Sequence, residues 1–281
     1  MKWPALHLSA PHAHPTRLKF RERYGPWALV AGGSHGLGAE YARQLARRGL
    51  DLVLVAEAAE PLGTLGRELS AQVQVRTVVS DLSRPDMLQS ILDASSDLEL
   101  GLLVCNASHA PIGAFLSRTL EDKLKVVAVN CAAPVALIHH VAPGMVARGR
   151  GGIVIMSSLA GLQGSALVAT YAASKAFDLV LGESLWEELS HHGVDVLALC
   201  AGATRTESYE ASRPHTSQWI PPLMEPAQVV QQALDQLSRG PSQVAGGWNR
   251  LIASLLHQLP RRMAVRIMGQ SMHKLYGERY Y

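Results

Sequence analysis

The chain has 281 residues, 48% of them hydrophobic and 17% charged, which is enough to bury a sizeable core in one large α/β domain or two small ones. Its formal net charge is only +3, from 26 basic and 23 acidic residues. The basic residues are scattered and lack interleaved aromatic residues, so we expect no nucleic-acid partner.

The cysteines indicate the cellular compartment. Cys105, Cys131 and Cys200 stand in apolar stretches, and their number is odd. Because an odd count without a disulfide framework is typical of a reducing environment, we expect a cytoplasmic protein with buried thiols.

Residues 1–24 predict a flexible N-terminal arm. Prolines interrupt its apolar residues, so it lacks the apolar core of a signal peptide. His7, His12 and His14 have no cysteine or carboxylate partner there, and we expect no metal site. We find no run of about 18 apolar residues and therefore expect no membrane-spanning helix.

The first ordered elements are a strand, a glycine turn and a helix. The apolar run Trp27–Ala31 predicts the strand, and an apolar stripe after residue 38 predicts the helix. Glycines let a pyrophosphate approach the backbone, and a helix N-terminus attracts the anion. A tight turn without a ligand is the alternative. The candidate cofactor-binding residues are Gly32, Ser34, His35, Gly36, Leu37 and Gly38.

A second strand, predicted over 52–56, is followed by Glu57. Dinucleotide-binding folds place the residue that binds the adenosine ribose at this point. A carboxylate there accepts hydrogen bonds from the ribose and repels a 2′-phosphate, which favours NAD, with NADP left open. The alternative is a Glu57 that faces solvent.

Two further predicted strands, over 73–79 and 98–104, are also followed by candidate cofactor residues. Asp81, beside Leu82, suits an adenine amino group, or it caps the next helix. Small residues after the second of these strands let the backbone lie against a cofactor. The candidates there are Asn106 and Ala107.

A long helix is predicted over 120–140, with Asn130 in its middle. A buried Asn needs hydrogen-bond partners. It either bends or caps the helix through backbone contacts, or holds a water that serves the active site.

The stretch from 153 to 175 carries the candidate chemistry. A predicted strand over 153–156 delivers Ser158, and Tyr171 and Lys175 lie four residues apart, so a helix puts them on one face. A cation beside a phenol favours the phenolate, which suits a general acid/base. This spacing also occurs by chance on ordinary helices. A last buried strand is predicted over 194–200.

These motifs resemble, in the same order, those of the short-chain dehydrogenase/reductase family, over roughly residues 25–240. The family's TGxxxGxG appears at 31–38, its NNAG at 105–108, and its PGxxxT at 201–206. The departures, none of which removes a chemical group used in catalysis, are Ala31, Ser108 and Ala201. The family's helix Asn, catalytic Ser and YxxxK pair are matched by Asn130, Ser158, Tyr171 and Lys175.

The resemblance implies a role for each matched residue. Tyr171 acts as general acid in ketone reduction and as base in alcohol oxidation, and Lys175 favours its phenolate and holds the nicotinamide ribose. Ser158 donates a hydrogen bond to the carbonyl oxygen. Asn130 holds a water that links Lys175 to solvent. The cofactor-binding residues added by the resemblance are Tyr171, Lys175, Gly202, Thr204 and Thr206.

Two segments near the C-terminus bear on the substrate and on partners. Residues 204–226 match the family's mobile lid, and their large apolar residues favour a lipophilic substrate, unless they form a docked surface loop. Residues 248–281 predict helices with an apolar stripe beside arginines. Such a helix packs on its own domain or on a partner subunit, or attaches to a membrane surface.

The sequence therefore predicts a Rossmann-like, doubly wound parallel sheet flanked by helices, in one domain over 25–247 with a helical extension over 248–281. The predicted function is NAD(P)-dependent interconversion of a lipophilic ketone and a secondary alcohol. One alternative is a non-catalytic dinucleotide-binding or regulatory protein, and another is a membrane-surface lipid-ketone reductase. The resemblance also implies a homodimer or homotetramer.

Overall fold

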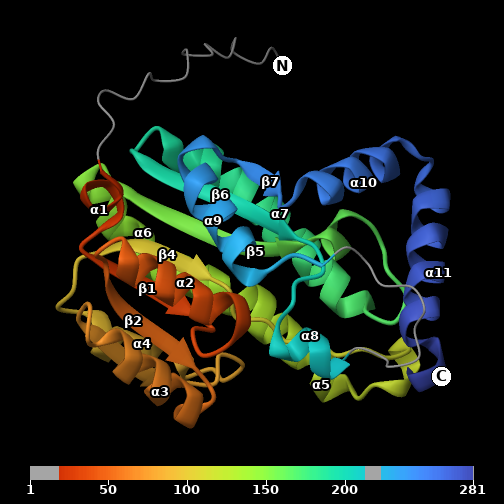
Figure 1. Ribbon diagram of the computed structural model, residues 1–281, viewed down its shortest axis with the longest axis horizontal. Coiled ribbons are helices and arrows are strands. Elements are labelled where there is room, and N and C mark those ends of the chain that lie inside the picture. The colour runs from red at the N-terminus through yellow and green to blue at the C-terminus, as the bar shows by residue number, and fades with distance from the viewer. Residues whose placement is uncertain (1–18, 213–222, 281) are drawn as a thin grey trace, which may run out of the picture.

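Seven parallel strands form the centre of the protein (Figure 1). The computed structural model describes residues 19–212 and 223–280. The predicted arm up to residue 18, with its three histidines, and residues 213–222 of the predicted lid lie outside the described residues. The strands run in the order β3-β2-β1-β4-β5-β6-β7. Their bounds are β1 Trp27–Ala31, β2 Asp51–Ala56, β3 Val75–Val79, β4 Leu100–Cys105, β5 Gly151–Ser158, β6 Val194–Ala201 and β7 Ser242–Val244.

Helices cover both faces of this sheet. The α-helices are α1 Phe20–Tyr24, α2 Gly36–Arg47, α3 Ala59–Leu69, α4 Met87–Ser95, α5 Leu120–Val127, α6 Ala133–Arg148, α7 Ala169–Ser190, α8 Glu207–Ser212, α9 Pro226–Gln236, α10 Gly247–Gln258 and α11 Arg261–Tyr280. Shorter turns of helix are η1 Phe115–Ser117, η3 Leu159–Leu162 and η4 Leu237–Arg239, and a π-helical turn, η2, spans Ala128–Ala132. The structure has the predicted Rossmann-like α/β fold.

Two hydrophobic cores explain why the strands are apolar throughout. One core lies between the sheet and α2, α3 and α9, and the other between the sheet and α4, α6 and α7. Because both faces are covered, every residue of β1, β4 and β6 is buried. Such strands read as continuous apolar runs instead of alternating ones. Each predicted strand lies within two residues of its observed bounds, whereas β7 has no counterpart in the prediction.

The last residues of the predicted N-terminal arm form a helix. Residues 20–24 form α1 instead of ending a flexible arm, because Tyr24 is buried and its hydroxyl donates to Asp195 Oδ2 at 2.6 Å. Arg23 pairs with the same carboxylate at 2.6 Å. A carboxylate on β6 therefore anchors α1 to the sheet.

The helix expected over 120–140 runs as one continuous helical segment from Leu120 to Arg148, through α5, η2 and α6. By length and mean hydropathy, 1.5 over its most apolar window, this segment could cross a membrane, contrary to the prediction that no stretch qualifies. Half of that window is buried inside the protein, and α6 packs on the core beside β4 and β5. A core helix of a globular domain passes the same test, so a spanning role does not follow.

The three cysteines differ in burial, whereas all three were predicted to be buried. Cys105 and Cys200 are buried, whereas Cys131, on the π-helical turn η2, is partly exposed. Burial raises the pKa of the Cys131 thiol to about 11 and that of Cys105 further, which keeps both protonated. The thiols are therefore poor nucleophiles.

Candidate active site

The candidate site lies where β1 and β4 end side by side. The chain leaves β1 toward β2 on one side, while β4, β5 and β6 follow on the other, so the strand order reverses between β1 and β4. In open parallel sheets, ligands bind in the crevice at such a point. Gly32 follows β1 here and Asn106 follows β4.

The glycine turn packs too closely for side chains. Gly32 has φ +80°, and a Cβ added to it would lie 2.6 Å from Ala107 Cα. A Cβ on Gly38 would lie 1.8 Å from Gly32 O, and Asn106 Nδ2 donates to that same oxygen at 2.9 Å. Gly36, at φ +51°, begins α2, whose N-terminal N–H groups face this crevice. A backbone free of Cβ atoms at a helix N-terminus fits a pyrophosphate.

A cavity of about 500 Å³ extends from this turn across the ends of the strands. It brings together most of the predicted cofactor residues, while Gly38 lies behind it under the turn, and Lys175, Gly202 and Thr204 face the neighbouring cavity. Its lining includes Gly32, Ser34, His35, Gly36, Leu37, Glu57, Asp81, Leu82, Asn106, Ala107, Tyr171 and Thr206. These residues fit the adenosine, pyrophosphate and nicotinamide ends of a dinucleotide.

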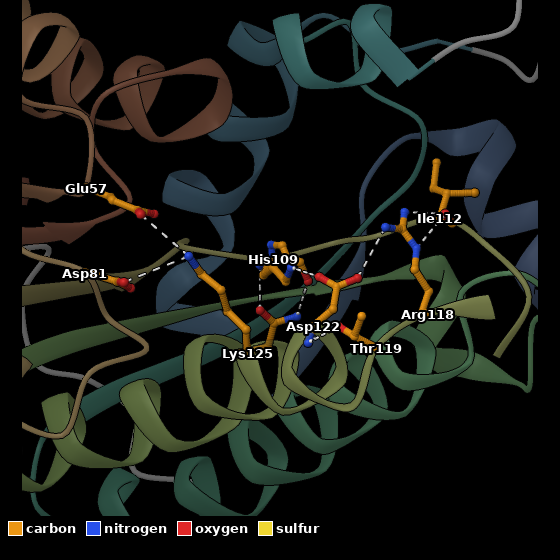
Figure 2. A network of polar contacts seen from close by, with 9 residues as sticks. Glu57, Asp81, His109, Ile112, Arg118, Thr119, Asp122 and Lys125 are labelled. Carbon is orange, nitrogen blue, oxygen red and sulfur yellow. Dashed lines mark hydrogen bonds and ion pairs between the residues drawn. The ribbon is translucent and has the colours of Figure 1, made fainter. Parts of the chain in front are cut away.

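At one end of this cavity a lysine lies between two carboxylates (Figure 2). Lys125 Nζ, from α5, is 3.5 Å from Glu57 Oε1 and 3.9 Å from Asp81 Oδ2. Hydrogen bonds from Ser83 lower the pKa of Asp81, and Lys125 lowers it further, so Asp81 is anionic at neutral pH. The sequence prediction considered only cations just after β2 and missed one that reaches the site from another helix.

The neighbouring cavity, of about 590 Å³, holds the candidate catalytic residues. Ser158, Tyr171 and Lys175 line it, together with Gly202, Thr204 and Thr206. Tyr171 lines both cavities, so this residue lies where they meet. The far wall comes from the C-terminal helices α10 and α11, through Ile252, Leu256, Met268, Met272, Leu275 and Tyr276.

The two serines at the end of β5 have different positions. Ser157 is buried, and its Oγ donates to Lys175 O at 2.6 Å, which ties β5 to α7. Ser158 is partly exposed to the cavity, and its Oγ accepts from Ala160 N at 3.2 Å, so its hydroxyl proton stays available. This geometry agrees with Ser158 as the hydrogen-bond donor.

Lys175 is almost completely buried, with an exposed fraction of 3%. Its Nζ lies 5.8 Å from the centre of the Tyr171 ring, as the shared helix face predicts. The ammonium donates to Met156 O at 2.7 Å and to Asp178 Oδ2 at 2.9 Å. Asp178, three residues further along α7, was not among the predicted site residues. Its spacing from Lys175, in an otherwise apolar stretch, was the available signal.

Asn130 lies at the centre of the π-helical turn and is fully buried. Its Oδ1 accepts from His109 N at 2.8 Å, and its Nδ2 donates to His109 O at 3.1 Å and to Ser174 Oγ at 2.9 Å. Of the two predicted roles, the helix distortion with backbone contacts is observed. The water-holding role stays a prediction.

His109 links this turn to a second polar cluster, drawn in Figure 2. Its Nε2 lies 2.7 Å from Asp122 Oδ1, and Arg118 NH1 is 3.3 Å from the other oxygen of the same carboxylate. These contacts fix the loop after β4 against α5. Among the described residues, no group of three or more metal-ligating side chains is found.

Comparison with known proteins places the chain in a family. It matches the short chain dehydrogenase family over residues 26–217. It is 29% identical over 235 residues to the 7beta-hydroxysteroid dehydrogenase of Clostridium sardiniense, covering 83% of this chain and 90% of that one. A solved 7beta-hydroxysteroid dehydrogenase has a TM-score of 0.84 at 26% identity, covering 89% of this chain and 99% of its own.

Two further relatives add information, one on length and one on the cofactor. The very-long-chain 3-oxoacyl-CoA reductase of Aspergillus terreus is 35% identical over 222 residues, which are 76% of this chain but 62% of the relative. A short-chain dehydrogenase from Sphingobium yanoikuyae, solved in complex with NADPH, has a TM-score of 0.71 at 33% identity, covering 84% of this chain and 97% of its own. The chain belongs to the short-chain dehydrogenase/reductase family, and it is an NAD(P)-dependent oxidoreductase.

Proposed function

We propose that this enzyme interconverts a bulky, lipophilic ketone and the corresponding secondary alcohol. The observation that carries the proposal is the cavity of about 590 Å³, with Tyr171 at one end and an apolar wall from α10 and α11 at the other. Cavities of this size enclose drug-sized molecules. The similarity to 7beta-hydroxysteroid dehydrogenases supports a rigid, multi-ring substrate such as a steroid.

Tyr171 is the proposed general acid. Its hydroxyl proton passes to the carbonyl oxygen as that oxygen becomes an alcohol, and returns to the tyrosine oxygen in the reverse direction. Ser158 Oγ, in the same cavity, donates a hydrogen bond to the oxygen on which negative charge develops. A bound nicotinamide cofactor supplies the hydride in reduction and accepts it in oxidation.

Lys175 acts on Tyr171 through its charge. With Nζ 5.8 Å from the ring centre and Lys175 almost completely buried, the ammonium stabilises the negative charge left on the Tyr171 oxygen after proton transfer. Met156 O and Asp178 hold Lys175 in this position. Lys175 also lines the substrate cavity, which meets the cofactor cavity at Tyr171. There its ammonium is suited to bind the ribose hydroxyls at the nicotinamide end of the cofactor.

We propose NAD as the preferred cofactor. Glu57 lies at the adenosine end of the cofactor cavity, where its carboxylate repels a 2′-phosphate. Lys125 offsets part of that repulsion, since its ammonium is 3.5 Å from Glu57. NADP binding is therefore weakened and not abolished.

A second copy of this chain is the proposed partner. Large apolar side chains are exposed on α5, α6 and α7, where none of the described residues covers them. They are Leu120, Leu124, Val127, Val135, Phe177 and Val180. Pairing of these helices between two copies removes that surface from water.

The substrate proposal is tested by narrowing the cavity. Met272 lies on the α11 wall, and Met272→Trp fills part of the space opposite Tyr171. We expect kcat/KM for a steroid ketone to fall by about tenfold or more, since lost fit in an apolar pocket costs roughly that factor. Turnover of a small ketone such as cyclohexanone should change by less than about twofold. Both are measured as loss of NADH absorbance.

The matched control is Met263→Trp, on the same helix but 50% exposed and outside the cavity. This variant should leave kcat/KM for both ketones unchanged. If Met272→Trp lowers kcat/KM equally for both ketones, or for neither, the far wall does not contact the substrate and the proposal is wrong.

A further inference from the structure

The C-terminal helices α10 and α11 carry an unusual charge distribution. Residues 236–277 contain none of the 23 acidic residues and six of the 26 Lys and Arg residues. The rest of the chain therefore holds 20 basic and 23 acidic residues, which is a net negative charge. Residues 236–277, which include α10 and most of α11, therefore carry the net positive charge of the protein.

Much of that charge is exposed where the two helices meet. Arg261 and Arg262 begin α11 directly after α10 ends, and Arg266 follows one turn later, all three exposed. Arg250 is exposed on α10. In Figure 1 the two helices form the outer edge of the molecule, away from the sheet.

The same helices expose apolar side chains. Trp248, Leu251 and Leu255 on α10 are 57%, 49% and 55% exposed, and their spacing of three and four residues puts them on one face. Met263, at the start of α11, is 50% exposed. Ile252 and Leu256, about 100° further around α10 than Leu251 and Leu255, line the substrate cavity. The apolar surface of α10 is therefore wider than its cavity-facing side, whereas a surface helix is usually polar on its outer side.

We propose that the outer face of α10 and the start of α11 dock on an anionic membrane surface. Trp and Leu side chains on one face, with arginines beside them, match an interfacial helix that inserts apolar groups among lipid headgroups. Basic residues are attracted to anionic lipid. We call Trp248, Leu251, Leu255, Met263, Arg262 and Arg266 the docking face.

Charge also argues against a second copy as the occupant of this face. A twofold contact through the docking face would bring the same arginines of two subunits together, with no acidic residue in the segment to separate them. The apolar residues proposed for pairing lie on α5, α6 and α7 instead. An acidic protein could also pair with these arginines. The exposed Trp and Leu side chains beside them favour a lipid surface instead, because such side chains insert among lipid headgroups.

Docking has a consequence that rests on the proposed function. Because the inner face of α10 lines the substrate cavity, docking its outer face places that cavity beside the bilayer. A lipophilic ketone concentrates in the bilayer, so the enzyme would meet its substrate there. The docking itself is independent of the reaction and is tested without it.

The test is co-sedimentation of the full-length protein with vesicles of phosphatidylcholine, with and without about 30 mol% phosphatidylserine. We expect sedimentation with the anionic vesicles that weakens as salt is added, and little with phosphatidylcholine alone. The variant Arg262→Gln/Arg266→Gln should bind anionic vesicles more weakly by about tenfold or more. Leu251→Gln/Leu255→Gln should lose binding to a similar extent, with unchanged turnover of a ketone in vesicle-free buffer.

Two controls match these variants away from the docking face. Arg47→Gln/Arg84→Gln removes the same charge from exposed positions on α2 and before α4. Leu116→Gln changes an apolar side chain that is 93% exposed. Neither should alter vesicle binding.

Three outcomes would overturn the proposal. The first is no binding of the full-length protein to either vesicle. The second is an equal loss in the control variants, which would indicate an effect of net charge alone. The third is retention on immobilised polyglutamate, or dimerisation lost in Leu251→Gln/Leu255→Gln, in the absence of vesicle binding, since the face would then belong to an acidic protein or to a second copy.

Discussion

At the scale of single residues, the ion pair between Lys175 and Asp178 couples the candidate catalytic site to pH. Both side chains are almost completely buried, and the second oxygen of Asp178, Oδ1, has no hydrogen-bond partner among the described residues. Burial raises the pKa of Asp178 to about 6, against the opposing influence of Lys175. The other titratable groups that face it are the thiols of Cys105 and Cys131.

The sign of the resulting pH effect follows from that pKa. Below about pH 6 Asp178 is protonated and neutral, and above it the carboxylate offsets part of the Lys175 charge that favours the Tyr171 phenolate. Asp178→Asn stays neutral at every pH. We expect the ratio of alcohol oxidation rates, variant over wild type, to be near one at about pH 5.5 and to rise toward tenfold by about pH 8.

The measurement is kcat/KM for alcohol oxidation across this range, with Asp93→Asn, an exposed carboxylate on α4, as the control. A ratio that stays constant with pH would show that Asp178 does not act on Tyr171 through its charge. Cofactor titration by fluorescence separates this effect from loss of the fold.

The proposed preference for NAD depends on Glu57 and Lys125. We expect the unmodified enzyme to bind NADH more tightly than NADPH. Glu57→Gln should tighten NADPH binding by about tenfold, because it removes a carboxylate near the 2′-phosphate. Lys125→Gln should weaken NADPH binding, because Glu57 is then unopposed.

Fluorescence titration of both cofactors measures this preference. Glu60→Gln makes the same charge change on the first turn of α3, outside the cavity, and should leave the affinities for NADH and NADPH unaltered. Tighter binding of NADPH than of NADH by the unmodified enzyme would contradict the assignment.

At the scale of secondary-structure elements, α1 depends on one carboxylate. Asp195 on β6 receives both Arg23 and the Tyr24 hydroxyl, and its side chain is 10% exposed. Asp195→Ala removes the acceptor of the buried Tyr24 hydroxyl and the carboxylate that pairs with Arg23, so the free energy of unfolding should fall by on the order of 2–3 kcal/mol. Chemical denaturation followed by circular dichroism measures it.

Asp97→Ala is the control for that prediction, because Asp97 also pairs with an arginine, Arg76, but is 62% exposed. Exposed pairs contribute about 1 kcal/mol or less, so the control should change little. Equal losses in the two variants would mean that α1 is not anchored through Asp195.

Comparison of the predicted and observed elements shows which contacts a sequence pattern encodes. The buried strands and the glycine turn were predictable because each has a local signal, a continuous apolar run or a Cβ-free turn. The anchoring of α1 and the position of Lys125 depend on residues far apart in the chain, so no local pattern reveals them. The short strand β7 is only partly buried and has no apolar run.

The C-terminal extension shows the same limit. Its apolar stripe was predictable, but one stripe is compatible with packing on the domain, on a subunit or on a membrane. Only the folded chain shows that Ile252 and Leu256 face the substrate cavity while Leu251 and Leu255 face outward.

At the scale of the whole molecule, the fold brings two cavities together at Tyr171. One lies at the switch point of the sheet and fits a dinucleotide, and the other lies under the C-terminal helices and fits a lipophilic molecule. We propose that the two ligands react beside the Tyr171 hydroxyl and that this hydroxyl transfers the proton.

Tyr171→Phe tests that claim most directly, because it removes one oxygen atom and keeps the ring. We predict that ketone reduction falls by about a thousandfold, while NADH binding, measured by fluorescence, changes by less than about twofold. Tyr209→Phe, which removes a hydroxyl elsewhere in the same cavity, should retain turnover. Undiminished ketone reduction by Tyr171→Phe would contradict the mechanism.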